Sequence, residues 1–178
     1  FDFMACNQIM VLSRVEAEDF AWPYPWCCIS IANDETLFAS ISRENRVGLL
    51  QVAFADITQP LKGFIAFYDS LGFDILDFVS QHWDTVDLLM VHCDAGISRS
   101  SAVAAAISRL KFGSEGDFLD SPFDPNPRVY RMLREIASGR SDFEQSGDDS
   151  SDDYQSDSDF ERDSYGDDED DLYDCEDD

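Results

Sequence analysis

The sequence has few basic residues: 12 Lys and Arg stand against 38 Asp and Glu. Without a basic cluster it lacks the positively charged face that binding to nucleic acid or to an anionic membrane surface needs. It also contains no apolar run near the roughly 20 residues of a membrane span, and no signal peptide with a charged start and an apolar core. We therefore expect a cytoplasmic protein with no nucleic-acid partner and no membrane partner.

Cysteines are too few and too irregularly spaced for a disulfide framework or a structural zinc site. There are five of them, an odd number without the paired spacing of zinc ligands. The sequence places them at Cys6, Cys27, Cys28, Cys93 and Cys175. We expect reduced thiols, no metal site and no cofactor.

Acidic residues concentrate in the segment 141–178, which holds 19 acids and one base, Arg162. Its apolar side chains are too few to form a core and its like charges repel, so we expect a disordered acidic tail. Four roles stay open for it: a solubilising extension, a substrate of an acid-directed kinase, binding of basic proteins, or competition for an anion-binding pocket. Residues 1–140, with a net charge of −8, have the length of one domain.

Within residues 1–140, short apolar runs alternate with longer segments of helical periodicity. The runs at 9–12, 26–31, 47–54 and 86–92 predict buried strands. Helices are expected between the last two strands, from about 98 to 112, and from about 126 to 137. This alternation predicts a single α/β domain whose central, mainly parallel sheet has helices on both faces. Ligands of such folds bind beyond the carboxyl ends of the strands, where Cys93 lies.

The stretch VHCDAGISRSS places a thiol and a fixed cation on one short strand-to-helix loop. A turn at Gly96 before a helix leaves backbone N–H groups unpaired around one concavity, which favours an anion. Arg99 offers a planar fork of donors that matches two oxygens of a phosphate. The same groups would stabilise a thiolate on Cys93, which makes it a candidate nucleophile. A buried cysteine is usually a small hydrophobe, but that reading leaves the glycine and the arginine unexplained.

Two neighbours of this loop have candidate supporting roles. Ser100 can donate a hydrogen bond to the sulfur of Cys93 when that sulfur leaves a reaction intermediate. His92 can brace the loop by bonding to backbone carbonyls.

His92, Cys93 and Arg99 match the H-C-(x)5-R signature of the cysteine-dependent protein tyrosine and dual-specificity phosphatases. Most of residues 9–137 resembles the small tyrosine-phosphatase-like proteins of bacteria and their phages, whereas the acidic tail departs from that pattern. The resemblance implies a phosphatase-like fold in which the cysteine attacks phosphorus and the loop arginine binds the phosphoryl oxygens. The phosphate would then sit on the loop between these two residues: Asp94, Ala95, Gly96, Ile97 and Ser98.

The resemblance also implies an aspartate on a separate loop that protonates the leaving oxygen. Asp56, in VAFADITQP, follows a predicted strand and precedes Cys93 by 37 positions. Asp69 and Asp74 are rivals within the predicted helical connection, and an aspartate after a strand often only caps a loop. The Trp-Pro-Tyr run at 22–24 resembles the tryptophan-proline-aspartate loop of larger tyrosine phosphatases but lacks the acid, so we interpret it as packing.

We therefore expect metal-independent hydrolysis of phosphate monoesters on protein through a phosphocysteine. Phosphotyrosine is the leading substrate, and dual specificity is the nearest alternative. The acid Asp94 and the absence of lysine from the loop disfavour highly phosphorylated inositides. Two other classes stay open, a catalytically silent phosphate-binding module and an interaction protein that works through its acidic tail. RNA 5′-triphosphatase and arsenate reductase chemistry rank lower.

Overall fold

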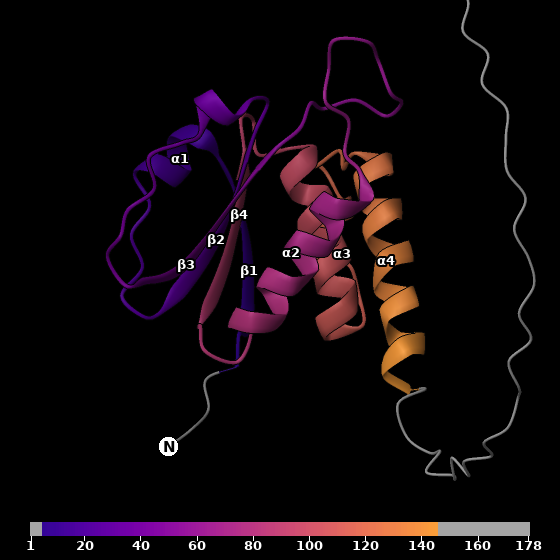
Figure 1. Cartoon of the computed structure of the whole chain (residues 1–178). Coiled ribbons are helices and arrows are strands. Elements are labelled where there is room, and N and C mark those ends of the chain that lie inside the picture. Colours follow the sequence, from indigo (N-terminus) through magenta and orange to yellow (C-terminus); the bar gives the residue numbers. More distant parts are fainter. Residues whose placement is uncertain (1–4, 146–178) are drawn as a thin grey trace, which may run out of the picture. The chain divides into compact units, whose positions relative to one another are not determined.

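A computed structural model describes residues 5–145, which contain a four-stranded sheet in the order β1-β4-β2-β3 (Figure 1). Every strand pair is parallel, which confirms the expected sheet. The strands follow the predicted apolar runs: β1 (Gln8–Ser13), β2 (Trp26–Ala32), β3 (Arg46–Ala53) and β4 (Leu88–Cys93). Because β4 is central, its carboxyl end brings Cys93 to the middle of one end of the sheet.

Helices cover the two faces unequally. α2 (Asp69–His82), α3 (Arg99–Phe112) and α4 (Pro127–Gln145) lie on one face, and the short α1 (Arg14–Glu18) lies on the other (Figure 1). Two 3-10 turns, η1 (Glu35–Leu37) and η2 (Gly116–Leu119), complete the described elements. The alternating pattern thus predicted the α/β class correctly but not the five-residue α1, whose sequence is too short for a helical period.

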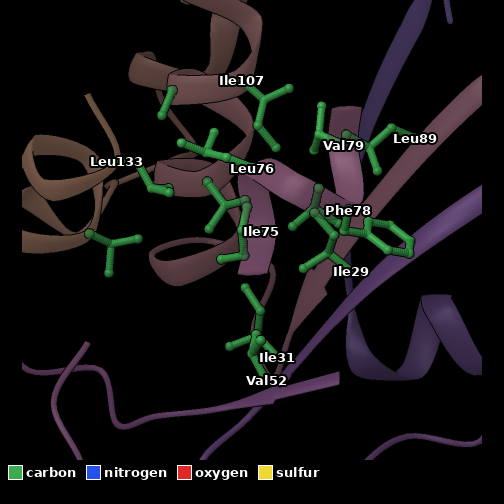
Figure 2. Packing of buried hydrophobic residues seen from close by; sticks show 14 of the residues in the cluster. Ile29, Ile31, Val52, Ile75, Leu76, Phe78, Val79, Leu89, Ile107 and Leu133 are labelled. Atoms are coloured by element: carbon green, nitrogen blue, oxygen red, sulfur yellow. The ribbon is translucent and has the colours of Figure 1, made fainter. Parts of the chain in front are cut away.

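Each face of the sheet has its own apolar cluster. Figure 2 shows the larger one, in which Ile29 of β2 and Leu89 of β4 pack against Ile75 of α2 and Ile107 of α3. Leu133 brings α4 into the same cluster. A smaller cluster around Trp26 fills the α1 face. Burial of apolar area on both faces holds the strands in register, and the register sets the ends of the strands that carry the site.

Local signals explain where the helices begin and end. Ser13 and Glu16 form a reciprocal capping box at α1, and Gly113 ends α3 in the left-handed conformation with φ of 82°. The side chain of Asn126 accepts hydrogen bonds from the backbone N–H groups of Arg128 at 3.0 Å and Val129 at 3.2 Å, which caps α4.

α4 is longer than the sequence suggested. We expected it to end near 137 and the acidic tail to begin at 141, but the helix continues to Gln145. Gly139 and the serines beside it are weak helix formers, which is why the pattern indicated an earlier end. The rest of the predicted tail, including Cys175, lies outside the described residues.

No helix in the described part of the chain is long and apolar enough to cross a membrane. The four cysteines within it are unpaired and buried. Burial raises the pKa of the Cys6 and Cys27 thiols and raises that of Cys28 to about 12. These three side chains are therefore uncharged parts of the packing.

Leu133 provides a test of how α4 contributes to the domain. Its side chain has no exposed area, so Leu133→Ala should lower the free energy of unfolding by about 2–5 kcal/mol, the usual cost of a buried leucine truncation. Glu135→Ala on the same helix is the control, because that side chain is 67% exposed, and it should change stability little. Urea unfolding followed by circular dichroism measures both. Equal small effects would show that α4 does not stabilise the sheet.

Candidate active site

The loop from Cys93 to Arg99, called here the Cys93–Arg99 loop, is held from outside by its carbonyl groups. The carbonyl of Asp94 accepts from Arg14 N–H at 3.1 Å, and that of Ser98 accepts from Asn126 N–H at 3.1 Å. Ile97 O likewise accepts from the segment before α4. Within the described part of the chain, these backbone hydrogen bonds use no N–H group of residues 94–99. The N–H groups are therefore left for a ligand, as an anion-binding concavity requires.

Gly96 is required by this geometry. Its φ is 70°, in the left-handed region. A Cβ atom there would lie 2.6 Å from the backbone nitrogen of Ser13 and 2.7 Å from the carbonyl carbon of Leu12. Because backbone atoms cannot move aside, any side chain at this position would push the loop away from the end of β1.

Cys93 ends β4 and begins the loop, with 2% of its surface exposed. Its Sγ lies 3.1 Å from Oγ of Ser100, in the first turn of α3. The structure thus places the hydroxyl where it can donate to the sulfur. The N-terminus of α3 also lies beside this sulfur, and its dipole favours a negative charge there.

Arg99 is the first residue of α3 and is 4% exposed. Its Nη1 donates to Asn33 Oδ1 and to Phe54 O, each at 2.8 Å, which fixes the guanidinium to the ends of β2 and β3. Its Nε, although buried, has no hydrogen-bond partner in the described residues. A buried donor without a partner is costly, so the site is built to receive an acceptor at Nε.

The carboxylate of Asp94 competes for the same guanidinium. Its Oδ2 lies 2.7 Å from Nη2 of Arg99 and accepts from Nδ2 of Asn33 at 3.2 Å. The Asp94 side chain is 45% exposed, so it stands at the mouth of the loop rather than beneath it. An anion that used both Nε and Nη2 of Arg99 would have to share Nη2 with this carboxylate.

Asp56 is joined directly to the Cys93–Arg99 loop. Its Oδ1 accepts from Oγ of Ser98 at 2.9 Å and from Nδ2 of Asn126 at 2.7 Å. Both contacts use Oδ1, which leaves Oδ2 for a further partner. The rivals Asp69 and Asp74 both lie on α2, as their spacing indicated. This geometry favours Asp56 as the acid beside the loop.

Asn126 is the residue that connects three parts of the site. Besides capping α4 and holding Asp56, it donates its backbone N–H to the loop carbonyl of Ser98. It is 3% exposed. Such a buried amide with every group engaged fixes the acid relative to the loop.

His92 links its own strand, β4, to the neighbouring strand β2. Its Nε2 lies 2.7 Å from Oγ of Ser30 on β2, a side-chain contact that the sequence did not indicate. Burial lowers the pKa of His92. A neutral ring that links β4 to β2 helps to position the end of β4, where Cys93 lies.

A hollow of about 340 Å³ opens beside the loop. We call it the site hollow; Asn33, Asp34 and Asp56 give it polar walls, and Ile57, Phe64 and Ile65 give it apolar walls. Asn33 is hydrogen-bonded to Arg99 and Asp56 is hydrogen-bonded to Ser98. The site hollow therefore adjoins the Cys93–Arg99 loop. In the described part of the chain, no group of three or more His, Cys, Asp or Glu side chains is placed to hold a metal ion.

The structure brings most of the predicted site residues together and adds two that the sequence did not indicate. Cys93 contacts Ser100, and Ser98 joins the same loop to Asp56, whereas Ala95 is exposed. Asn33 and Asn126 were missed as site residues. For Asn126, the sequence carries a local signal, because an asparagine directly before a proline is typical of the start of a helix. The Trp-Pro-Tyr run lies before β2, at the opposite end of the sheet. Trp22 packs there against the smaller cluster, as expected, whereas Pro23 and Tyr24 are exposed.

Comparison with known proteins gives no match to a family description and no match to a curated sequence. Solved structures do match. The human tyrosine phosphatase-like serine/threonine/tyrosine-interacting protein is 18% identical with a TM-score of 0.57, over 75% of this chain and 93% of that one. PTPMT1 in complex with PI(5)P is 14% identical with a TM-score of 0.53, over 77% and 94%. Human DUSP28 is 14% identical with a TM-score of 0.50, over 76% and 94%. At these identities the likeness concerns the fold.

Asp94 allows a test of the anion site that does not depend on turnover. Asp94→Asn keeps the side-chain size but removes the carboxylate that pairs with Nη2 of Arg99, so inorganic phosphate should bind about two- to fivefold more tightly, as expected for a partly exposed charge. Asp117→Asn, on η2, should leave phosphate binding unchanged. Isothermal titration with phosphate measures both. Weaker binding to Asp94→Asn would mean that Asp94 holds the guanidinium in place rather than competing with the ligand.

Proposed function

The described residues have the fold of the cysteine-dependent tyrosine and dual-specificity phosphatases, and from this premise we propose that the protein hydrolyses phosphate monoesters on other proteins. One observation carries the proposal. The thiol of Cys93, the buried Arg99 with its unpartnered Nε, and Asp56 all meet on one loop whose N–H groups are left for a ligand. A nucleophile, an anion receptor and an acid are the three parts that such a reaction needs.

In the first step, the Cys93 thiolate attacks phosphorus, so that a sulfur–phosphorus bond forms and the ester oxygen–phosphorus bond breaks. The leaving oxygen takes a proton from the carboxyl group of Asp56. Arg99 and the N–H groups of the loop hold the negative charge of the transferring phosphoryl group. These groups supply the charge stabilisation that divalent ions supply in metal-dependent phosphatases, so we propose metal-independent catalysis.

In the second step, water attacks the phosphocysteine. Asp56 takes a proton from the water, the sulfur–phosphorus bond breaks, and inorganic phosphate leaves. Ser100, 3.1 Å from Sγ, donates a hydrogen bond to the departing thiolate. The cycle ends with the thiolate restored and Asp56 protonated again.

Phosphotyrosine is the substrate that we propose first. The apolar walls of the site hollow, Ile57, Phe64 and Ile65, lie beside the anion-binding loop, and they suit an aromatic ring attached to the phosphate. Phosphoserine and phosphothreonine carry less apolar surface than phosphotyrosine and would cover less of this apolar wall. Dual specificity is therefore the broader form of the same proposal.

A catalytically silent phosphate-binding module is the second candidate. The pairing of Arg99 Nη2 with Asp94 favours it, because it reduces the donors available to a transferring phosphoryl group. The human relative that is named a phosphatase-like interacting protein is consistent with such a role. Turnover of a small aryl phosphate separates the two candidates.

Substitution of the two central residues tests the proposed chemistry. Cys93→Ser should abolish turnover of p-nitrophenyl phosphate while the melting temperature stays near that of the wild type, because an alcohol stays protonated near neutral pH. Arg99→Lys should lower kcat/KM by about 10²–10³-fold, since one ammonium group cannot reproduce the planar fork. Steady-state rates on the aryl phosphate measure both. Near-normal rates in a folded Cys93→Ser would remove the mechanism.

Asp56 is tested with leaving groups of different acidity. A tyrosyl phenolate is a poor leaving group because tyrosine has a pKa of about 10, so Asp56→Asn should slow hydrolysis of free phosphotyrosine by about 10²–10⁴-fold. The same variant should slow p-nitrophenyl phosphate far less, because that phenol needs little protonation. Asp69→Asn, at the start of α2, is the matched control and should stay near wild type. An equal loss on both substrates would assign Asp56 to loop positioning.

A further inference from the structure

A second hollow lies on the other side of Ile65 from the site hollow. It measures about 570 Å³, and we call it the edge hollow; Gln51 to Ala53 form its floor, and Glu35, Tyr68 and Asp74 are among its walls. Ile65 lines both hollows, and the sequence neighbours Asp34 and Glu35 line one each. The carbonyl of Ile65 accepts from the backbone N–H of Ala55 at 2.7 Å, so residue 65 lies between the two hollows. A molecule that occupies both must therefore pass over the exposed side chain of Ile65.

The edge hollow lies along the open edge of the sheet. β3 is the last strand in the order β1-β4-β2-β3. The hollow is lined by Asp74 of α2, which covers one face of the sheet, and by Phe38, which follows η1 and leads to the cluster on the other face. The lining residues therefore come from segments on both faces of the sheet, and β3 lies between them. This places the hollow at the β3 edge of the sheet.

The backbone of β3 presents hydrogen-bonding groups at this edge. Phe54 N–H donates to Ala32 O of β2 at 2.9 Å, and in a parallel strand these directions alternate from one residue to the next. The groups of Gln51 and Ala53 therefore point away from β2. No hydrogen bond joins their backbone to a described residue outside the sheet. Unpaired groups of this kind accept an added strand.

Charge on the two hollows favours a positively charged occupant. Asp34 and Asp56 line the site hollow, and Glu35 and Asp74 line the edge hollow. The Thr36 backbone N–H donates to Asp34 and holds the pKa of that carboxyl below its usual value, so it stays ionised. No Lys or Arg lines either hollow in the described part of the chain. Ile65, 53% exposed, and Tyr68, 48% exposed, add apolar surface.

We propose that these features select the substrate: an extended phosphopeptide whose flank lies along β3 and carries a basic side chain opposite Glu35 and Asp74. The inference rests on the proposed function, because it places the phosphorylated residue at the Cys93–Arg99 loop. Main-chain hydrogen bonds to Gln51 and Ala53 hold the flank extended, and the carboxylates supply the preference among sequences. A flank rich in Asp or Glu is repelled by the same groups.

The first experiment compares phosphotyrosine peptides that differ at a single flanking position. That position carries Arg, Gln or Glu, and each position on both sides of the phosphotyrosine is tested in turn. At one position, kcat/KM at low salt should be about fivefold higher for Arg than for Glu, and salt should reduce the difference. Glu35→Lys with Asp74→Lys should reverse the order. Asp84→Lys, the same charge change beyond the far end of α2, should leave it unchanged.

The small substrate p-nitrophenyl phosphate separates this inference from the proposed function. All these variants should hydrolyse it at the wild-type rate, because it does not reach the edge hollow. Normal rates on it together with equal rates on the Arg, Gln and Glu peptides would overturn the inference and leave the proposed function intact. If the wild-type protein does not hydrolyse p-nitrophenyl phosphate at all, the proposed function fails. The same peptides are then compared by fluorescence anisotropy, where equal affinities would overturn the inference.

A second experiment tests the strand addition. Single N-methyl groups, placed on successive amides of the best Arg peptide, should lower kcat/KM about tenfold at every second position, because a strand uses alternate amides at one edge. A uniform effect, or none, would show that the flank does not pair with β3.

Discussion

The whole site depends on how the Cys93–Arg99 loop is held. Its carbonyls are bonded from outside by Arg14 and Asn126, and Gly96 lies against the backbone of β1 with no room for a Cβ atom. These contacts use the loop's carbonyls and leave its N–H groups without backbone partners in the described residues. The same turn places the start of α3 behind Cys93, so that the loop and the helix dipole favour negative charge at one point. A shift of this loop would disrupt the proposed anion site and displace the proposed nucleophile together.

Negative side chains surround this anion receptor. Asp94, Asp56 and Asp34 all lie near the mouth of a loop that is built to hold an anion. Their field opposes polyanions, whereas a single phosphoryl group that reaches Nε of Arg99 gains a buried donor without a partner. The arrangement thus admits one phosphoryl group and favours positive charge around it. This is the electrostatic basis for proposing protein substrates over highly phosphorylated small molecules.

The sequence predicted the parts of the site that are close together in the chain. Cys93, Gly96 and Arg99 lie within seven residues at a strand-to-helix junction, so their local pattern carries the geometry. Asp56 could be proposed because it follows a strand. Asn126 reaches Asp56 across 70 positions, and no local pattern encodes such a contact. The fold class followed from the alternation of strands and helices, but the uneven covering of the two faces did not. Those features depend on packing between segments distant in the sequence.

The central claim is that Cys93 is the nucleophile, and the most direct measurement is the position of the phosphoryl group during turnover. The full chain is mixed with ³²P-labelled phosphotyrosine, quenched with denaturing detergent at neutral pH within the first turnovers, digested and mapped by mass spectrometry. The account predicts a transient label on the peptide that contains Cys93, bound through sulfur. Label on another residue, or rapid hydrolysis with no labelled protein at any time point, would contradict it.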